Sequence, residues 1–129
     1  MKPKKITPTA AELDILNILW EKEPLTVKDI HALICKSKDV GYTTTLKIMQ
    51  NMTTKGLLKR ERSGKSHLYF SNHAREETRE RLLNRFVDSA FGGSASSLVM
   101  QLLGNKKTSV EELDEIQQII EQIKTDSSL

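Results

Sequence analysis

Apolar residues recur at helical spacing in three stretches of the first 56 residues, and short polar or glycine-containing breaks separate these stretches. Thr9 and Glu12 form a capping-box pattern that starts the first predicted helix, which ends at a Glu-Pro pair because the residue before proline avoids the α conformation. Thr26 can cap a second helix, and a third helix starts near Thr43 and ends at Gly56, a natural left-handed cap. The residues predicted to face inward are Leu13, Leu16, Leu19 and Trp20 in the first helix, Val27, Ile30 and Ile34 in the second, and Leu46, Met49 and Met52 in the third.

The apolar period changes to two at Leu57, which is typical of β-strands. Two strands are predicted, joined by a tight turn at Ser63-Gly64-Lys65, and the second strand carries Leu68 and Phe70 at alternate positions. Three helices followed by a hairpin are typical of the winged helix-turn-helix. The sequence therefore predicts a mainly α fold whose first domain, residues 1–71, is a winged helix.

Three further helices are predicted in residues 72–129. A long helix from roughly Ala74 to Ala90 carries its apolar residues late, a short apolar helix spans Leu98–Leu103, and a last helix follows a capping box of Ser109 and Glu112. This region has many large aliphatic side chains but too few helices to enclose them, because an all-helical unit of below about 60 residues is marginal without a partner.

The simplest partner for these helices is a second copy of the chain, because a twofold interface buries the same patch on both copies. Residues 72–129 are therefore predicted to form a helical dimerisation domain. The residues predicted to form the dimer interface are Phe86, Val87, Phe91, Leu98, Leu102, Leu113, Ile116, Ile120 and Ile123. The alternative is that these helices pack back on the N-terminal half in a monomer.

Positive charge is concentrated in the first half of the chain. The net charge of the 129 residues is +3, but residues 1–71 contain 13 Lys and Arg against 7 Asp and Glu, whereas residues 72–129 contain 7 against 10. This split indicates that the basic residues 1–71 carry the binding function and that residues 72–129 support them. No apolar signal segment follows the basic N-terminus, so a cytoplasmic protein without membrane insertion is expected.

The polar face of the third predicted helix and the basic hairpin together form a candidate DNA-binding surface. Asn and Gln can bridge adenine, Lys can donate to guanine and a Thr methyl can pack on a thymine methyl, while hairpin cations can hold phosphates without reading sequence. The candidates are Thr43, Thr44, Lys47, Gln50, Asn51, Thr54 and Lys55 on the helix and Lys59, Arg60, Arg62 and Lys65 on the hairpin. The alternatives are an ordinary solvated helix face and a set of charges that protects an edge strand from pairing.

The sequence offers little for catalysis or metal binding. His31 and Cys35 lie one helical turn apart, but no further cysteine or suitably spaced histidine completes a metal site, and a small buried thiol is expected at Cys35. The single cysteine excludes an intramolecular disulfide. There is no nucleophile–base set and no glycine-rich cofactor loop, so neither an enzyme nor a cofactor is expected. A metal-dependent nuclease would need clustered acidic or histidine ligands beside the basic surface, where Glu61 lies alone in the sequence.

The chain resembles the penicillinase-repressor family of bacterial winged-helix regulators over nearly its whole length. The resemblance rests on Thr9–Trp20, Thr26–Ile30, Tyr42–Thr44, Lys55–Leu57, Arg62–Tyr69, Ser97–Leu102 and the acidic–aliphatic last helix. It implies a homodimeric repressor, not an enzyme, that binds double-stranded DNA at inverted-repeat operators of the TACA/TGTA type. It also implies release by proteolysis, triggered when a membrane metalloprotease-type sensor detects a β-lactam.

Three departures from the family pattern change what the resemblance implies. By position, the cleaved bond is Gln101–Leu102, where family members have Asn and Phe; the alternative is that this segment serves as dimer core. A common arginine of the recognition helix is Asn51 here, which points to an altered operator. The cysteine pairs of the copper-responsive branch are missing after Cys35, so metal sensing of that kind is not expected.

A different class of function remains open at this point. A winged helix also serves as a protein-interaction module, in which the domain binds a partner protein and the basic surface is incidental. Salt-insensitive binding to DNA, or none, would favour that alternative.

Overall fold

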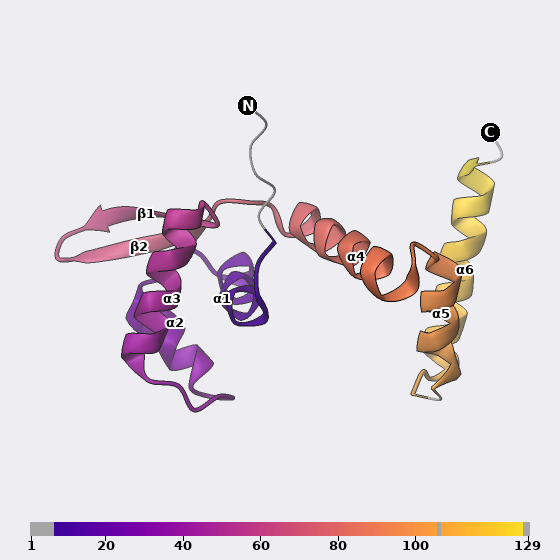
Figure 1. The fold of residues 1–129 in the computed structure, drawn as a ribbon, viewed down its shortest axis with the longest axis horizontal. Helices are drawn as coiled ribbons and strands as arrows, with labels where there is room; N and C mark the ends of the chain where they lie inside the picture. The colour runs from indigo at the N-terminus through magenta and orange to yellow at the C-terminus, as the bar shows by residue number, and fades with distance from the viewer. Residues whose placement is uncertain (1–6, 106, 128–129) are drawn as a thin grey trace. The chain divides into compact units, whose positions relative to one another are not determined.

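The computed structural model describes residues 7–105 and 107–127. The chain forms two compact units, with the boundary after Leu83. Its described residues form six helices and one two-stranded antiparallel sheet (Figure 1), which confirms the predicted mainly α fold with a winged helix at the start. The elements are α1 (Ala10–Glu21), α2 (Val27–Ile34), α3 (Tyr42–Lys55), β1 (Leu58–Ser63), β2 (Ser66–Ser71), α4 (Arg75–Phe91), α5 (Ala95–Gly104) and α6 (Val110–Ser127). Within the described ranges, no helix is both long enough and apolar enough to cross a membrane.

Reciprocal capping boxes start the first two helices. At α1, Thr9 N donates to Glu12 Oε1 (2.9 Å) and Glu12 N donates to Thr9 Oγ1 (3.2 Å). At α2, Thr26 and Asp29 form the same pair of bonds, 3.2 and 3.1 Å long. Each box satisfies two backbone N–H groups that have no carbonyl partner within the helix. The left-handed cap predicted at the end of α3 is also present, because Gly56 has φ +88°.

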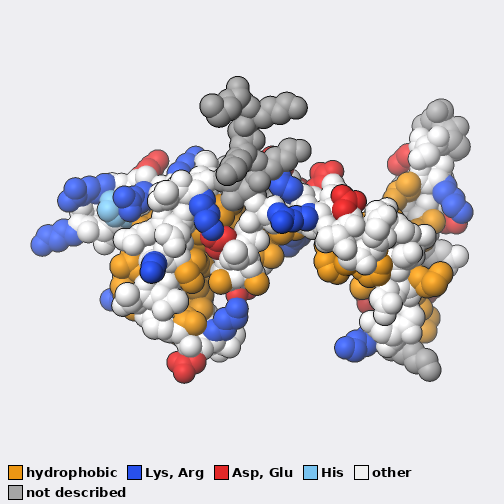
Figure 2. All heavy atoms as spheres, viewed as in Figure 1, with side chains coloured by type: hydrophobic (Ala, Val, Ile, Leu, Met, Phe, Trp, Pro, Cys, Tyr) orange, Lys and Arg blue, Asp and Glu red, His pale blue; other side chains and the backbone are white. Residues whose placement is uncertain are grey.

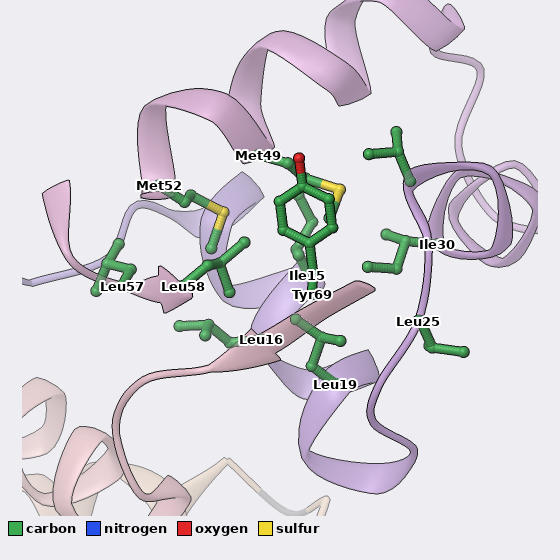
Figure 3. Close-up of a cluster of buried hydrophobic side chains, with 11 residues drawn as sticks. Ile15, Leu16, Leu19, Leu25, Ile30, Met49, Met52, Leu57, Leu58 and Tyr69 are labelled. Atoms are coloured by element: carbon green, nitrogen blue, oxygen red, sulfur yellow. The ribbon is translucent and has the colours of Figure 1, made fainter. Parts of the chain in front are cut away.

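One apolar cluster joins the three helices to the hairpin (Figure 3). Its buried members are Ile15, Leu16, Leu19, Leu25, Val27, Ile30, Met49, Met52, Leu57, Leu58 and Tyr69. The prediction that Leu46 faces inward is only partly correct, because Leu46 packs half-buried at the edge of the cluster while its neighbour Thr45 is 1% exposed. Thr45 can occupy an inward position because its hydroxyl is bonded to His31 Nδ1 (2.9 Å).

The hairpin is anchored to the helical core through β2. β1 and β2 pair along their whole length, and Gly64 (φ +62°) and Lys65 form the turn that the sequence predicted. Leu25, in the loop between α1 and α2, exchanges two backbone hydrogen bonds with Tyr69 (3.3 and 2.8 Å). Because the Tyr69 side chain is buried at the same point, the base of the hairpin is held in place against the helices.

The C-terminal helices expose most of their apolar side chains. Among the described residues, none in α5 or α6 is buried. Helix α5 begins at Ala95, three residues before the predicted start at Leu98, because Ser94 Oγ accepts a hydrogen bond from Ser97 N (3.2 Å) and caps the helix. Ser109 caps α6 in the same way, with a bond of 3.1 Å.

Candidate nucleic-acid interface

Helix α3 has an apolar face that points inward and a polar face that points outward. All seven of its candidate residues are exposed, in agreement with the predicted orientation: Thr43, Thr44, Lys47, Gln50, Asn51, Thr54 and Lys55. Besides the buried Thr45, two threonines of this helix already use their hydroxyls, since Thr53 Oγ1 donates to Met49 O (2.9 Å) and Thr54 Oγ1 donates to Gln50 O (3.1 Å). Within the described residues, no hydrogen bond occupies the side-chain amides of Gln50 and Asn51, which are therefore free to meet a base edge.

The four candidate cations of the hairpin are exposed and lie on both of its faces. Arg60 lies opposite the buried Tyr69 in the strand pairing and shares its face with Arg62, whereas Lys59 lies on the other face and Lys65 in the turn. Figure 2 shows lysine and arginine side chains gathered over the hairpin. The hairpin therefore presents positive charge on each side of a narrow ribbon.

A groove of about 550 Å³ lies between the start of α2, helix α3 and the hairpin. Gln50 lines it from α3, Arg60 and Lys65 line it from the hairpin, and Lys28 lines it from α2. Asp29 is also part of the lining, but its carboxylate belongs to the capping box of α2. Sequence reasoning missed Lys28, because a lysine in the first turn of α2 gives no sign that the hairpin folds beside it. Three cations around one groove can bind a negatively charged phosphate group.

Lys55, the last candidate of α3, is bound to α1. Its Nζ lies 2.8 Å from Glu12 Oε2, and the Glu12 side chain is 5% exposed. Burial acts to raise the pKa of Glu12, but hydrogen bonds from Lys55 and Thr9 and the charge of Lys55 outweigh burial and hold that pKa below its ordinary value. The ion pair fixes the end of α3 against the start of α1. A role for Lys55 in DNA binding stays a prediction.

The Glu12→Gln substitution is expected to lower the free energy of unfolding by about 1 kcal/mol at neutral pH, as for a charged hydrogen bond whose partner is half-exposed. Gln is accepted in a capping box, so the variant changes mainly the charge. Because the folded-state pKa of Glu12 is lowered, its stabilisation is present above the ordinary pKa of 4.5 and is lost as pH falls through the folded value.

Urea unfolding followed by Trp20 fluorescence, at neutral pH and at about pH 3, measures this effect. The difference between wild type and Glu12→Gln should shrink at acid pH. Glu21→Gln, which changes an exposed carboxylate on the same helix, is the matched control. A difference that stays constant with pH would contradict a role for the Glu12 charge.

The prediction of a buried thiol was wrong, because Cys35 is exposed. Helix α2 ends at Ile34, so Cys35 is its C-cap and lies beyond the inward face that Ile30 and Ile34 define. Its Sγ lies 3.3 Å from His31 Nε2 and 3.6 Å from Val40 O. In the part of the chain that the structure describes, no three His, Cys, Asp or Glu side chains are grouped to hold a metal ion.

The nine candidate interface residues of the C-terminal region are all accessible in the described chain, and none is buried. Phe86 is 52% exposed, Leu102 is 55% exposed and Ile123 is 58% exposed. Gln101 is exposed as well, so both residues of the candidate cleavage bond lie on the surface of α5.

Comparison with known proteins finds similarity along nearly the whole chain. A family model described as penicillinase repressor matches residues 8–122. The penicillinase repressor of Staphylococcus aureus is 27% identical over 123 residues, which cover 95% of this chain and 98% of that protein. The penicillinase repressor of Bacillus licheniformis is 24% identical over 114 residues, which cover 88% of this chain and 89% of that protein.

A solved structure supports the fold of the first half. The solution structure of the DNA-binding domain of the repressor BlaI aligns with a TM-score of 0.50 and 18% identity, over 59% of this chain and 90% of that domain. At this level of identity the likeness concerns the fold alone, and it agrees with the three helices and hairpin described above.

Proposed function

Because the chain belongs to the penicillinase repressor family, we propose that it is a homodimeric transcriptional repressor that binds an inverted-repeat operator in double-stranded DNA. One observation carries the proposal: the seven polar candidates of α3 are exposed, and the helix leads directly into a cationic hairpin. In this proposal residues 1–71 bind DNA and residues 72–129 join the two copies.

We assign base recognition to α3 and backbone contact to its surroundings. An α-helix fits the major groove, where Gln50 and Asn51 can bridge adenine N6 and N7 and Lys47 can donate to guanine. Lys28 and the hairpin cations fix the register by contacts to phosphates. In a twofold dimer, the two copies of α3 enter major grooves one helical turn apart, about 34 Å along the duplex.

The distribution of exposed apolar side chains supports the assignment of the C-terminal region to dimerisation. Of the twelve large apolar residues that are exposed in the described chain, ten follow residue 82. They are Leu83, Phe86, Val99, Met100, Leu102, Val110, Leu113, Ile119, Ile120 and Ile123. Scattered apolar residues are normal on a surface, but a concentration of this kind marks an interaction site.

Inactivation by proteolysis is the part of the proposal that concerns regulation. A cut between Gln101 and Leu102 on the exposed α5 would separate α6 from the DNA-binding half. Each winged helix would then keep only its own contacts, and the gain from binding two half-sites at once would be lost. We assign the cut to a membrane sensor protease that responds to a β-lactam.

Selection of DNA by the full chain, combined with sedimentation, tests the proposal. A random duplex pool should yield an inverted repeat related to TACA/TGTA, bound by a dimer with an affinity that falls steeply with added salt. A monomer that enriches no repeat would contradict the proposal. Salt-insensitive or absent binding would favour a protein-interaction module, and cleavage of the duplex in the presence of a divalent metal would favour a nuclease.

A further inference from the structure

The connection between the hairpin and α4 is tightly bonded to the winged helix. Glu23 Oε2 accepts hydrogen bonds from Ser71 N (2.8 Å) and Ser71 Oγ (2.9 Å). Trp20 Nε1 donates to His73 O (3.0 Å). Ser71 is thus held by Glu23, just after α1, and His73 is held by Trp20 in the last turn of α1.

The middle residue of this connection is bonded to the end of the recognition helix. Asn72 Nδ2 donates to Gly56 O (2.9 Å), and Asn72 N donates to Leu57 O (3.0 Å). Gly56 is the C-cap of α3, so Asn72 contacts the backbone at the point where that helix ends. We call the side chains of Trp20, Glu23 and Asn72 the junction clasp.

The start of α4 belongs to the same compact unit as the winged helix. Thr78, in the first turn of α4, is 4% exposed, and the chain up to Leu83 forms one compact unit with the winged helix. A polar connection without such bonds behaves as a flexible tether, whose end-to-end distance varies widely. Five hydrogen bonds to residues 71–73 instead hold the connection against the winged helix.

We infer that the junction clasp determines which separation of two half-sites the dimer accepts, so that Trp20, Glu23 and Asn72 are positioning residues for operator selection. The inference rests on the proposed function. The recognition helix and the helix that leads towards the dimerisation region are coupled through Gly56 and Asn72. A dimer with a fixed coupling can place its two copies of α3 in register with one spacing only, whereas a loosely coupled dimer tolerates several.

The geometry of DNA makes the spacing requirement measurable. One turn of the duplex takes about 10 base pairs, so five inserted base pairs move the second half-site to the opposite face of the duplex. The probes are the inverted repeat enriched by the full chain, the same repeat with one to ten inserted base pairs, and a duplex that carries one half-site. Binding is measured by fluorescence anisotropy.

Glu23→Ala and Asn72→Ala are the test variants. Glu21→Ala is the matched control, because it removes the same charge from the end of α1, and Glu21 makes no hydrogen bond or ion pair within the described residues. We expect wild type and control to prefer the original spacing strongly over the spacing with five inserted base pairs. In both test variants this preference should fall by about tenfold, because they lose part of the affinity gained from binding two half-sites at once. Their affinity for the single half-site should change less than about twofold.

The outcomes separate the inference from the function on which it rests. Test variants that keep the wild-type spacing profile would overturn the inference alone. Test variants that lose half-site affinity as much as full-site affinity would also overturn it, since the clasp would then act on α3 itself. A wild-type chain that enriches no repeat would overturn the proposed function and the inference together.

Discussion

The Ile120→Glu substitution should convert the dimer into a monomer and lower affinity for the enriched inverted repeat by about 100-fold or more, the usual gain from joining two binding modules. Ile120 lies on α6 and is 43% exposed in the single chain, so the fold of one copy does not depend on burying it. In the proposed dimer the same position is buried, and an unpaired carboxylate there carries a large desolvation cost.

The interface side of α6 follows from the spacing of its apolar residues. The steps between them alternate between three and four positions, which forms one stripe along a helix; the residues are Leu113, Ile116, Ile120 and Ile123. Gln118, which is exposed among polar neighbours such as Asp114 and Gln122, lies off this stripe.

Gln118→Glu is therefore the matched control for Ile120→Glu. Both substitutions add one negative charge to α6, so a loss confined to Ile120→Glu cannot come from general repulsion of DNA. Sedimentation velocity gives the oligomeric state, and anisotropy gives the affinity for the repeat and for a single half-site. Half-site affinity should be the same in both variants, and a monomeric Ile120→Glu variant that still binds the full repeat tightly would contradict the role assigned to the dimer.

The same experiment bears on regulation by proteolysis. If dimerisation supplies most of the affinity, a chain cut at Gln101–Leu102 should bind the repeat about as weakly as Ile120→Glu does. Two independent ways of separating the copies would then give one residual affinity, that of a lone winged helix.

Local signals in the sequence were enough to place the starts of α1 and α2 and the end of α3. A capping residue such as Thr9 or Thr26 acts on backbone groups three positions away, and Gly56 ends α3 through its own backbone conformation. The hairpin turn at Gly64 and Lys65 is equally local. These features need no knowledge of the rest of the fold, which explains why the sequence predicted them.

Features that depend on packing between elements were predicted less well. Leucine is more often buried than threonine, so Leu46 was placed inside and Thr45 was not considered. In the structure Thr45 is more buried than Leu46, because His31 of α2 supplies a hydrogen-bond partner for the Thr45 hydroxyl. The prediction that Cys35 is buried was wrong for a related reason. The periodicity of α2 cannot be continued past Ile34, where the helix ends.

Contacts between segments far apart in the chain were not predicted at all. Lys28 joins Arg60 and Lys65 around one groove, although more than 30 positions separate it from either. Asn72 reaches back to Gly56 across the whole hairpin. No periodicity or spacing in the sequence indicates such pairs, because they arise only when the strands fold onto the helices.

The Asn51→Ala substitution should lower affinity for the enriched repeat by about 1–3 kcal/mol per contacted base and relax selectivity at that base, as expected for the loss of a bidentate amide contact. Asn51 is exposed, and alanine is the best helix former, so α3 should remain folded.

The Lys65→Ala substitution should have a different effect. It should weaken binding to all duplexes alike and reduce the slope of log affinity against log salt by about 1. Anisotropy on repeats with single base changes and on a scrambled duplex, at several salt concentrations, separates the two effects. Equal losses for both variants on matched and scrambled DNA would contradict the assignment of base reading to α3 and phosphate contact to the hairpin.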